Sequence, residues 1–197
     1  MGNHLPVLLR DTAMKTAIET RRLLLRPLRD DDAQTLVDEL NNFAIACNTA
    51  HIPKPYHRSD ALEFLDFAKA GNERSRISGV EEKARSGQLI GIISYEWSEA
   101  KGDAELGYWL SQSVWGRGFG SEAALRMVED AFADAGHVTL AACYHNDNPA
   151  SARILTKVGF EIVGSCTSFS KAQGKDVPVT NMRLTRERWL AQNTLAT

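Results

Sequence analysis

The stretch SVWGRGFGSEAA, residues 113–124, decides how the rest of the chain is interpreted. Three glycines alternate in it, at positions 116, 118 and 120, between a strand-like run at 104–110 and a helical pattern. A glycine-rich turn before a helix presents backbone N–H groups and the positive end of the helix dipole, and together these bind anions. The stretch therefore predicts a phosphate-binding loop. A flexible turn explains the glycines alone equally well, so the remaining sequence has to decide between the two.

Length and composition indicate one folded domain in a reducing compartment. The hydrophobic share of 43% and the charged share of 24% in 197 residues are typical of a globular protein and not of disorder. A net charge of −2 predicts no nucleic-acid partner, and no apolar run approaches the ~18 residues of a membrane span. Three scattered cysteines fit neither a disulfide framework nor a metal site. We therefore expect a cytoplasmic protein without a metal, whose thiols lie in the core.

We expect the folded domain to span residues 19–185. Residues 1–18 are expected to be a flexible arm, unless translation begins at Met14. The apolar run at 5–9 is too short for a signal peptide. Residues 186–197 are expected to form a C-terminal tail, either a short amphipathic helix or a loose end.

Hydrophobic periodicity predicts a mixed α/β domain. The expected elements, in chain order, are a strand at 22–26, helices at 29–40 and 59–71 with irregular chain between them, strands at 76–81, 88–97 and 104–110, a helix at 121–135, a strand at 138–144, a helix at 149–158, and strands at 160–163 and 177–184 around a polar loop. The three middle strands have short connections, which predict an antiparallel meander. The strands on either side of the glycine loop and its helix are expected to be parallel, with a ligand crevice at their carboxyl ends.

Several stretches together resemble the GCN5-related N-acetyltransferases. The run from Trp115 to Gly120 resembles the family's acetyl-CoA loop, Gln/Arg-x-x-Gly-x-Gly/Ala, with Trp115 in the place of Gln/Arg. The run from Asn148 to Ser151, followed by KVGF at 157–160, resembles the family's Asn-x-x-Ala/Ser stretch that ends in Lys-x-Gly-Phe. Residues 20–28 and 52–56 resemble the branch that contains the Rim-type ribosomal-protein N-terminal acetyltransferases. The resemblance covers residues 19–184.

The resemblance implies the family fold and reaction. The fold is an α/β domain with a mixed sheet: antiparallel N-terminal strands, a splayed central parallel pair, and helices on both faces. The reaction is direct transfer of the acetyl group from acetyl-CoA to a primary amine. Such a transfer needs a bound pyrophosphate, a deprotonated amine, and stabilisation of both the oxyanion and the departing thiolate.

The resemblance assigns the donor, acetyl-CoA, to the glycine loop and the strand before it. The pyrophosphate is expected on the backbone amides of the loop, which are those of Arg117, Gly118, Phe119, Gly120 and Ser121. The Arg117 side chain either adds charge or is a solvated surface arginine. The backbone around Tyr108 and Leu110 is expected to bind the pantetheine arm and polarise the acetyl carbonyl, while their side chains are expected in the core. Asn148 holds the arm, caps its helix, or does both.

One residue of the family pattern is missing. The Tyr that often stands seven residues after the Asn, as proton donor to the thiolate, is Leu155 here. The Rim-type branch also tends to lack this Tyr and has a Ser three residues after the Asn, which is Ser151 here. The resemblance therefore implies that Ser151 hydrogen-bonds and protonates the CoA sulfur. An ordinary serine in the first turn of a helix is the alternative.

The general base is expected on the strand that leads to the reaction centre. An aliphatic amine titrates near ~10.4, so it must lose a proton before it attacks. Glu105 lies on this strand, where family members often place a carboxylate. We expect Glu105 to be the base or to orient the amine. A surface glutamate is the alternative for Glu105, and the other candidates for the base are Glu96, Asp103, His145 and a water chain.

The sequence leaves the acceptor amine open. The Rim-type resemblance favours a protein N-terminal α-amine, and the alternative is a small amine such as a polyamine, an amino acid or an aminoglycoside. A non-catalytic acyl-CoA-binding regulator is a further alternative. Dimers are common in this branch, so a homodimer is expected. A dinucleotide-binding oxidoreductase is disfavoured, because its glycines have the spacing G-x-G-x-x-G and not G-x-G-x-G.

Overall fold

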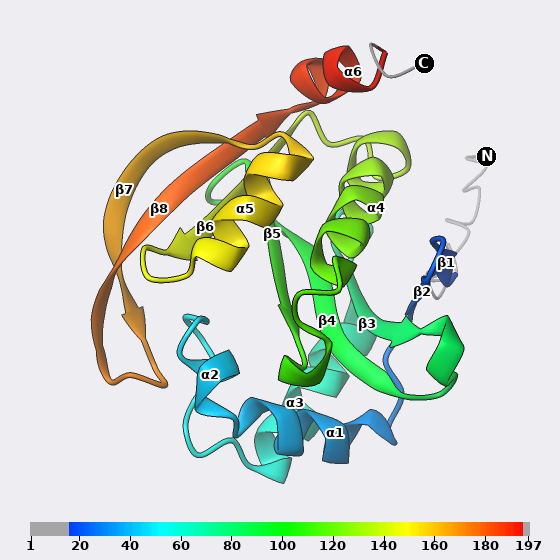
Figure 1. Cartoon of the computed structure of the whole chain (residues 1–197), viewed down its shortest axis with the longest axis vertical. Helices are drawn as coiled ribbons and strands as arrows, with labels where there is room; N and C mark the ends of the chain where they lie inside the picture. The colour runs from blue at the N-terminus through cyan, green and yellow to red at the C-terminus, as the bar shows by residue number, and fades with distance from the viewer. Residues whose placement is uncertain (1–15, 195–197) are drawn as a thin grey trace, which may run out of the picture.

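The computed structural model describes residues 16–194 and contains one eight-stranded mixed sheet with helices on both faces (Figure 1). The elements, in chain order, are β1 (Ile18–Glu19), β2 (Leu23–Arg26), α1 (Asp32–Leu40), α2 (Phe43–Ala46), α3 (Arg58–Ala70), β3 (Arg76–Glu82), the 3₁₀ turn η1 (Lys83–Arg85), β4 (Leu89–Ser98), β5 (Asp103–Leu110), the 3₁₀ turn η2 (Gln112–Val114), α4 (Phe119–Ala133), β6 (Thr139–His145), α5 (Pro149–Val158), β7 (Glu161–Ser170), β8 (Lys175–Thr185) and α6 (Arg186–Thr194). The strands lie in the order β1-β2-β3-β4-β5-β6-β8-β7. The predicted mixed α/β fold is therefore confirmed.

The centre of the sheet opens between β5 and β6. Within the described chain these two strands pair in parallel at just two positions, Ala104 with Leu140 and Glu105 with Ala141. Beyond this contact β5 remains paired with β4 as far as Leu110, and β6 remains paired with β8 as far as His145. The two strands therefore separate toward their carboxyl ends. Among the described residues, neither the edge of β5 that faces β6 nor the edge of β6 that faces β5 has a strand partner in this region.

Each face of the sheet has its own hydrophobic core. Helices α4 and α5 cover one face, where Phe119, Met127 and Leu155 pack on side chains of the central strands. Helices α1 to α3 cover the other face, where Leu36 and Leu65 form a second cluster. Successive side chains of a strand point to opposite faces. On β5, Leu106 and Tyr108 pack toward α4 and α5, whereas Trp109 packs in the cluster under α1 to α3, on the face to which Glu105 also belongs.

Two segments that were expected to be irregular are regular in the structure. The polar segment 164–176 is mostly the β7–β8 hairpin, in which Cys166 pairs with Val179. Nearly all of β7 is exposed on both faces, so its sequence has no hydrophobic alternation to reveal a strand. The segment 43–58 contains α2, whose four residues are too few for a helical period, and Asn42 caps it by accepting from the Ala44 N–H.

The ends of the expected domain also differ in detail. Ile18 pairs with Leu25, so the sheet begins one residue before the expected boundary at 19, while residues 1–15 and Met14 lie outside the described chain. At the other end, α6 packs Trp189 against Phe132, with 5.8 Å between ring centroids. No helix within residues 16–194 combines the length and the apolarity that a bilayer crossing requires.

Candidate active site

The glycine loop leads directly into α4. Gly116 and Gly118 have φ of 75° and 78°, a left-handed conformation that costs any other residue strain. Gly118 is the N-cap of α4, so the helix begins at Phe119, two residues earlier than expected, and its first N–H groups are free of partners within the helix. Gly120 has a different role. A Cβ there would lie 2.7 Å from Ile154 Cδ1, so this glycine lets α4 pack closely on α5.

Trp115 fastens the loop to the end of β5. Its indole Nε1 donates a hydrogen bond of 2.7 Å to the carbonyl of Leu110, and its side chain remains half exposed. This contact explains how a Trp can stand where the family pattern has Gln or Arg. The Trp115 side chain thus fixes the position of the loop relative to the end of β5.

Two guanidinium groups lie beside the start of α4. Arg117 binds the carboxylate of Glu82, with 3.0 Å from Nη1 to Oε2, and lies 4.4 Å from the centroid of the Phe119 ring. This ion pair holds the pKa of Glu82 below its usual range. Arg22 donates to the carbonyl of Arg117 at 2.9 Å and lies 4.6 Å from the same ring centroid. No local pattern in the sequence indicates that Arg22, 95 residues before Arg117, contacts this loop.

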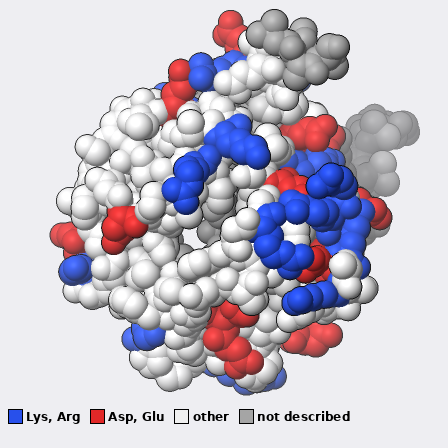
Figure 2. Space-filling view, in the orientation of Figure 1, with Lys and Arg blue, Asp and Glu red and all other residues white. Residues whose placement is uncertain are grey.

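Basic side chains gather on the face that contains the loop. Figure 2 shows lysines and arginines collected beside the start of α4 and over the β3–β4 connection, with a smaller group over α5. The whole chain has a net charge of −2, so this concentration is local. The arginines nearest the loop are paired with carboxylates, Arg117 with Glu82 and Arg22 with Glu122, so the free helix N–H groups are the main feature here that suits an anionic ligand.

Ser151 and Tyr108 meet across the opening. Asn148 caps α5 by accepting from the Ser151 N–H at 3.1 Å. The Ser151 hydroxyl oxygen lies 2.9 Å from the phenol oxygen of Tyr108. Desolvation raises the pKa of Tyr108 to about 12, although the hydrogen bond with Ser151 acts in the opposite direction. The Tyr108 side chain packs on the core as expected, but its polar end reaches the opening.

Glu105 lies at the apex of the opening, on the opposite face of the sheet from Tyr108. It belongs to one of the two residue pairs that join β5 to β6. Its carboxylate accepts from Lys101 Nζ at 2.7 Å, and the Cys143 thiol lies 3.6 Å from its Oε1. Glu96 is its direct cross-strand neighbour on β4 and accepts from the Ser94 hydroxyl at 2.9 Å. Two carboxylates therefore lie side by side where β5 and β6 part.

The other two candidates for the base differ in their distance from this pair, because Asp103 is two residues before Glu105 on the same face of β5, whereas His145 is remote. Asp103 is at the start of β5, with Arg183 Nη2 3.8 Å from its Oδ2. His145 is buried at the carboxyl end of β6, four residues beyond the last pair with β5. The structure thus groups Glu96, Glu105 and Cys143, and it separates His145 from them along β6.

The expectation that the cysteines lie in the core is wrong. Cys143 and Cys166 are exposed and Cys47 is partly buried. Cys143 falls on the face of β6 away from α4 and α5, and Cys166 is on the exposed edge strand β7, so neither is covered by a helix. Even so, desolvation by the neighbouring strands, together with the nearby charge of Glu105, raises the pKa of the Cys143 thiol to about 11. That thiol is protonated at neutral pH and is a poor nucleophile.

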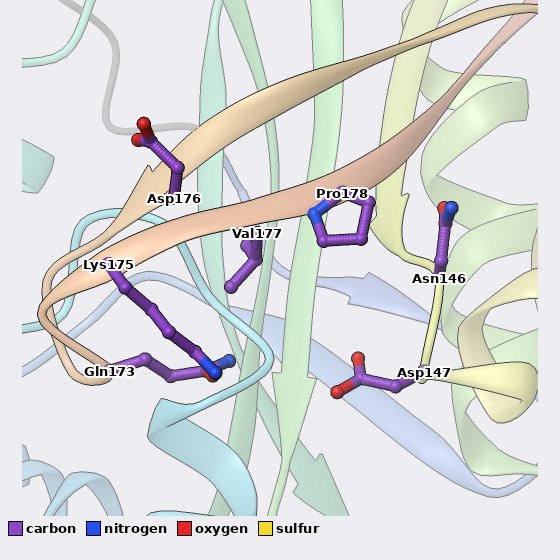
Figure 3. Close-up of a pocket in the computed structure, with 7 residues that line it drawn as sticks. All are labelled: Asn146, Asp147, Gln173, Lys175, Asp176, Val177 and Pro178. Atoms are coloured by element: carbon purple, nitrogen blue, oxygen red, sulfur yellow. The ribbon is translucent and has the colours of Figure 1, made fainter.

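A polar pocket of about 370 Å³ opens beyond the end of β6. It is lined by Asn146, Asp147, Gln173, Lys175, Asp176, Val177 and Pro178. In Figure 3 the side chains of Asp147 and Lys175 reach toward this space from the β6–α5 connection and from the β7–β8 hairpin. Within residues 16–194 there is no group of three His, Cys, Asp or Glu side chains arranged to hold a metal ion.

Comparison with known proteins identifies this arrangement. The sequence profile of the acetyltransferase (GNAT) domain matches residues 22–161. The uncharacterized N-acetyltransferase YoaA of Bacillus subtilis is 28% identical over 166 residues, which are 80% of this chain and 89% of that protein. The crystal structure of spermidine N-acetyltransferase from Vibrio cholerae, with CoA and spermine, has a TM-score of 0.73 at 22% identity and covers 87% of this chain and 99% of that one.

A ribosomal-protein-S5-alanine acetyltransferase from Vibrio fischeri has a TM-score of 0.71 at 19% identity, covering 88% of this chain and 98% of that one. At these identities the two crystal structures establish the fold, while the profile establishes the family because it spans most of the chain. The chain therefore belongs to the GNAT acetyltransferases, and it is an N-acetyltransferase that uses acetyl-CoA.

Proposed function

We propose that this enzyme transfers the acetyl group to a primary amine by direct attack within a ternary complex, without an acyl-enzyme. The observation that carries the proposal is the opening between β5 and β6, which has a glycine loop on one side and a carboxylate pair at its apex. The high pKa of Cys143, about 11, supports direct attack, because the thiol nearest to the carboxylates is not ionised at neutral pH.

The donor is proposed to bind along β5, on the face covered by α4 and α5. The free N–H groups from Gly118 to Ser121 would bind its pyrophosphate, and Arg22 and Arg117 would add positive charge next to them. The edge of β5 that faces β6 has no strand partner from Leu106 to Leu110 in the described chain, and its groups other than the Leu110 carbonyl, which accepts from Trp115, would hydrogen-bond the pantetheine arm in the manner of a strand. With the donor bound in this way, the thioester would lie close to Ser151, whose hydroxyl is proposed to hydrogen-bond and protonate the sulfur.

The amine is proposed to approach from the opposite face of the sheet. On that face Glu105 is available to accept a proton or to orient the amine, and Glu96 is its nearest carboxylate neighbour. Lys101 now occupies the carboxylate of Glu105, and an incoming ammonium group would compete for the same oxygen. A carboxylate that exchanges one ammonium partner for another is well placed to orient an amine.

We propose a protein N-terminal α-amine as the acceptor, in line with the resemblance to the Rim-type branch. An α-amine titrates near ~8 and needs little help to lose its proton, which suits a carboxylate already paired with a lysine. A small cationic amine is the second candidate. The carboxylates of Glu96 and Glu105, with Asp147 in the polar pocket, favour it because together they would attract more than one positive charge.

One assay separates these acceptors. Release of the CoA thiol is measured with N-terminal peptides of varied first residue and with an equal panel of polyamines, amino acids and aminoglycosides. A peptide preference of at least about 10-fold in kcat/KM supports the first candidate, and the reverse preference supports the second. Tight CoA binding by calorimetry without transfer to any amine would favour a non-catalytic acyl-CoA-binding regulator. A homodimer in the cytoplasm also remains part of the proposal, and sedimentation velocity tests the dimer.

A further inference from the structure

A tyrosine and a serine from opposite walls of the opening form one hydrogen-bonded pair. Tyr108 lies on β5, three residues beyond the last pair with β6, and points toward α4 and α5. Ser151 is in the first turn of α5, the helix that follows β6. The phenol oxygen lies 2.9 Å from Ser151 Oγ and 3.4 Å from the Ser151 carbonyl oxygen, which can only accept. Either hydroxyl can donate in the contact between the phenol and Ser151 Oγ, so the phenol donates to Ser151 Oγ when the serine proton is directed at another acceptor.

The surroundings keep that proton on the phenol. The ring packs on the apolar cluster beneath α4 and α5, and desolvation raises the pKa of Tyr108 to about 12. Ser151 is itself fixed, because its N–H is bound to the Asn148 side chain. A protonated phenol held against a fixed hydroxyl has its proton in a defined position, and its high pKa means that the proton leaves only as negative charge develops on the serine oxygen.

We propose that Tyr108 supplies, through Ser151, the proton that the departing CoA thiolate takes up. This inference rests on the proposed role of Ser151 at the sulfur. When the C–S bond breaks, the sulfur keeps the electron pair and takes the proton of Ser151 Oγ. The proton of the Tyr108 phenol moves to Ser151 Oγ in the same step. The resulting phenolate regains a proton from water before the next turnover, so the pair is unchanged over a cycle.

Acting through Ser151 makes Tyr108 a positioning residue whose effect depends on its partner. Tyr108→Phe keeps the ring and its packing but removes the hydroxyl. The expected result is a fall in kcat of roughly 100-fold, as for loss of a general acid, with the KM for acetyl-CoA changed by less than about 2-fold. Ser151→Ala should lower kcat by a similar factor. The double variant should be no slower than the slower single variant, because the two groups act in series.

A matched control removes a phenol elsewhere. Tyr56 is buried in the core under α1 to α3, and burial raises its pKa to about 12 as well. Tyr56→Phe should leave kcat within about 2-fold. The inference is overturned if Tyr108→Phe also keeps kcat within about 2-fold. It is also overturned if the falls in kcat of Tyr108→Phe and Ser151→Ala multiply in the double variant. A third contrary result is a Tyr108→Phe protein whose melting temperature and acetyl-CoA affinity fall together with kcat.

A second measurement needs no acceptor amine and separates failure of this inference from failure of the proposed transfer. The protein is labelled with ¹³C at the tyrosine ring carbon that bears the oxygen, and the Tyr108 signal is assigned with Tyr108→Phe. CoA should shift this signal, whereas desulfo-CoA, which lacks the sulfur, should shift it much less. In Ser151→Ala the difference between the two ligands should disappear. Equal shifts in the wild type with both ligands bound would refute the inference even if transfer to an amine is active.

Discussion

The carboxylate of Glu82, at the end of β3, binds the guanidinium of Arg117 in the glycine loop, with Oε2 3.0 Å from Nη1. The positive charge that the loop would offer to a pyrophosphate is thus already matched by a negative one. Arg117 lies over the ring of Phe119, the first residue of α4. We therefore expect Glu82 to adjust the affinity of the loop for an anion as well as to hold Arg117 in place.

Substituting Arg117 should weaken the binding of acetyl-CoA, whereas substituting Glu82 should strengthen it. Arg117→Gln leaves Glu82 uncompensated near the pyrophosphate, and the Kd for acetyl-CoA should rise by about 5-fold, the effect of ~1 kcal/mol at an exposed site. Glu82→Gln should lower the Kd by a similar factor. Arg126→Gln, which breaks a pair with Glu129 on α4, is the control and should do neither. Calorimetry at two salt concentrations measures the Kd for acetyl-CoA of each variant. Equal Kd values for all three variants would contradict the prediction.

Glu105→Gln should slow the chemical step without weakening donor binding. Loss of a base or of an amine-orienting group typically lowers kcat by about 100-fold, while the KM for acetyl-CoA should stay within about 3-fold. Glu129→Gln, which changes an exposed glutamate on α4, is the control and should retain kcat within about 3-fold. Steady-state rates from pH 6 to 10 provide the measurement. If the rates of the Glu105→Gln enzyme depend on pH as those of the wild type do, Glu105 takes no part in the reaction.

Gly118→Ala and Gly136→Ala should cost similar stability but differ in donor binding. Both glycines have positive φ, 78° and 71°, where an alanine costs about 1–2 kcal/mol. Gly118 caps α4 at the loop, so its substitution should also weaken CoA binding by about 10-fold. Gly136 lies beyond the other end of α4, and a Cβ there meets nothing within 4 Å. Chemical denaturation with a CoA titration tests this, and equal CoA affinities would argue against the loop as pyrophosphate site.

Glu122 should contribute stability that acid removes. Burial alone would raise the pKa of Glu122, but hydrogen bonds from Thr20 and from the backbone and guanidinium of Arg22 outweigh it and lower that pKa. A lowered folded-state pKa means that the contribution is complete above the unfolded value of ~4.3 and is lost as pH falls through the folded value. Glu122→Gln should therefore lower the free energy of unfolding by about 1–2 kcal/mol at pH 7.

The difference between this variant and the wild type should narrow as the pH falls below ~4. Glu129→Gln, an exposed glutamate on the same helix, should change stability by less than about 0.5 kcal/mol. Urea denaturation at several pH values gives both numbers. A Glu122→Gln deficit that stays constant down to pH 3 would show that packing, and not charge, holds β1 and β2 to α4.

Cys143 should be slow to alkylate despite its exposure. With a pKa of about 11, its thiolate fraction at pH 8 makes iodoacetamide react roughly 100-fold more slowly than with an unperturbed thiol. A variant with Cys47→Ala and Cys166→Ala isolates this thiol for mass spectrometry. Cys143→Ser should also retain kcat, and two-substrate kinetics should give intersecting lines. Parallel lines, as in ping-pong kinetics, would restore Cys143 as a nucleophile.

The sequence predicted the fold because its periodic elements are also its buried ones. The run from Leu89 to Trp97 and the helix after the glycine loop carry a clear hydrophobic pattern, and both form the core. The hairpin of β7 and β8 was predicted too short, with strands at 160–163 and 177–184, because β7 buries almost nothing and depends on backbone pairing with a strand nearby in the chain. Exposed strands lack the alternation on which such predictions depend.

The candidate site was only partly accessible from the sequence. The spacing of the glycines indicated the loop, because positions with a left-handed backbone strongly favour glycine. The contacts that set its charge and position, those of Arg22, Glu82 and Trp115, join residues up to 95 positions apart and leave no local pattern. The Tyr108–Ser151 pair is likewise a product of how β5 and α5 are placed, 43 residues apart.

With the donor bound along β5 as proposed, the two-residue contact between β5 and β6 would link the supply of acetyl-CoA to the stability of the enzyme. A sheet that is open at its centre lacks backbone hydrogen bonds between the separated parts of β5 and β6. A donor bound there would supply some of these bonds, in the manner of an additional strand that can dissociate. At a concentration 100 times its Kd, such a ligand adds about 2.7 kcal/mol to the free energy of unfolding. A cell rich in acetyl groups would then hold more of this enzyme folded, and a starved cell would expose the same central strands to exchange and proteolysis.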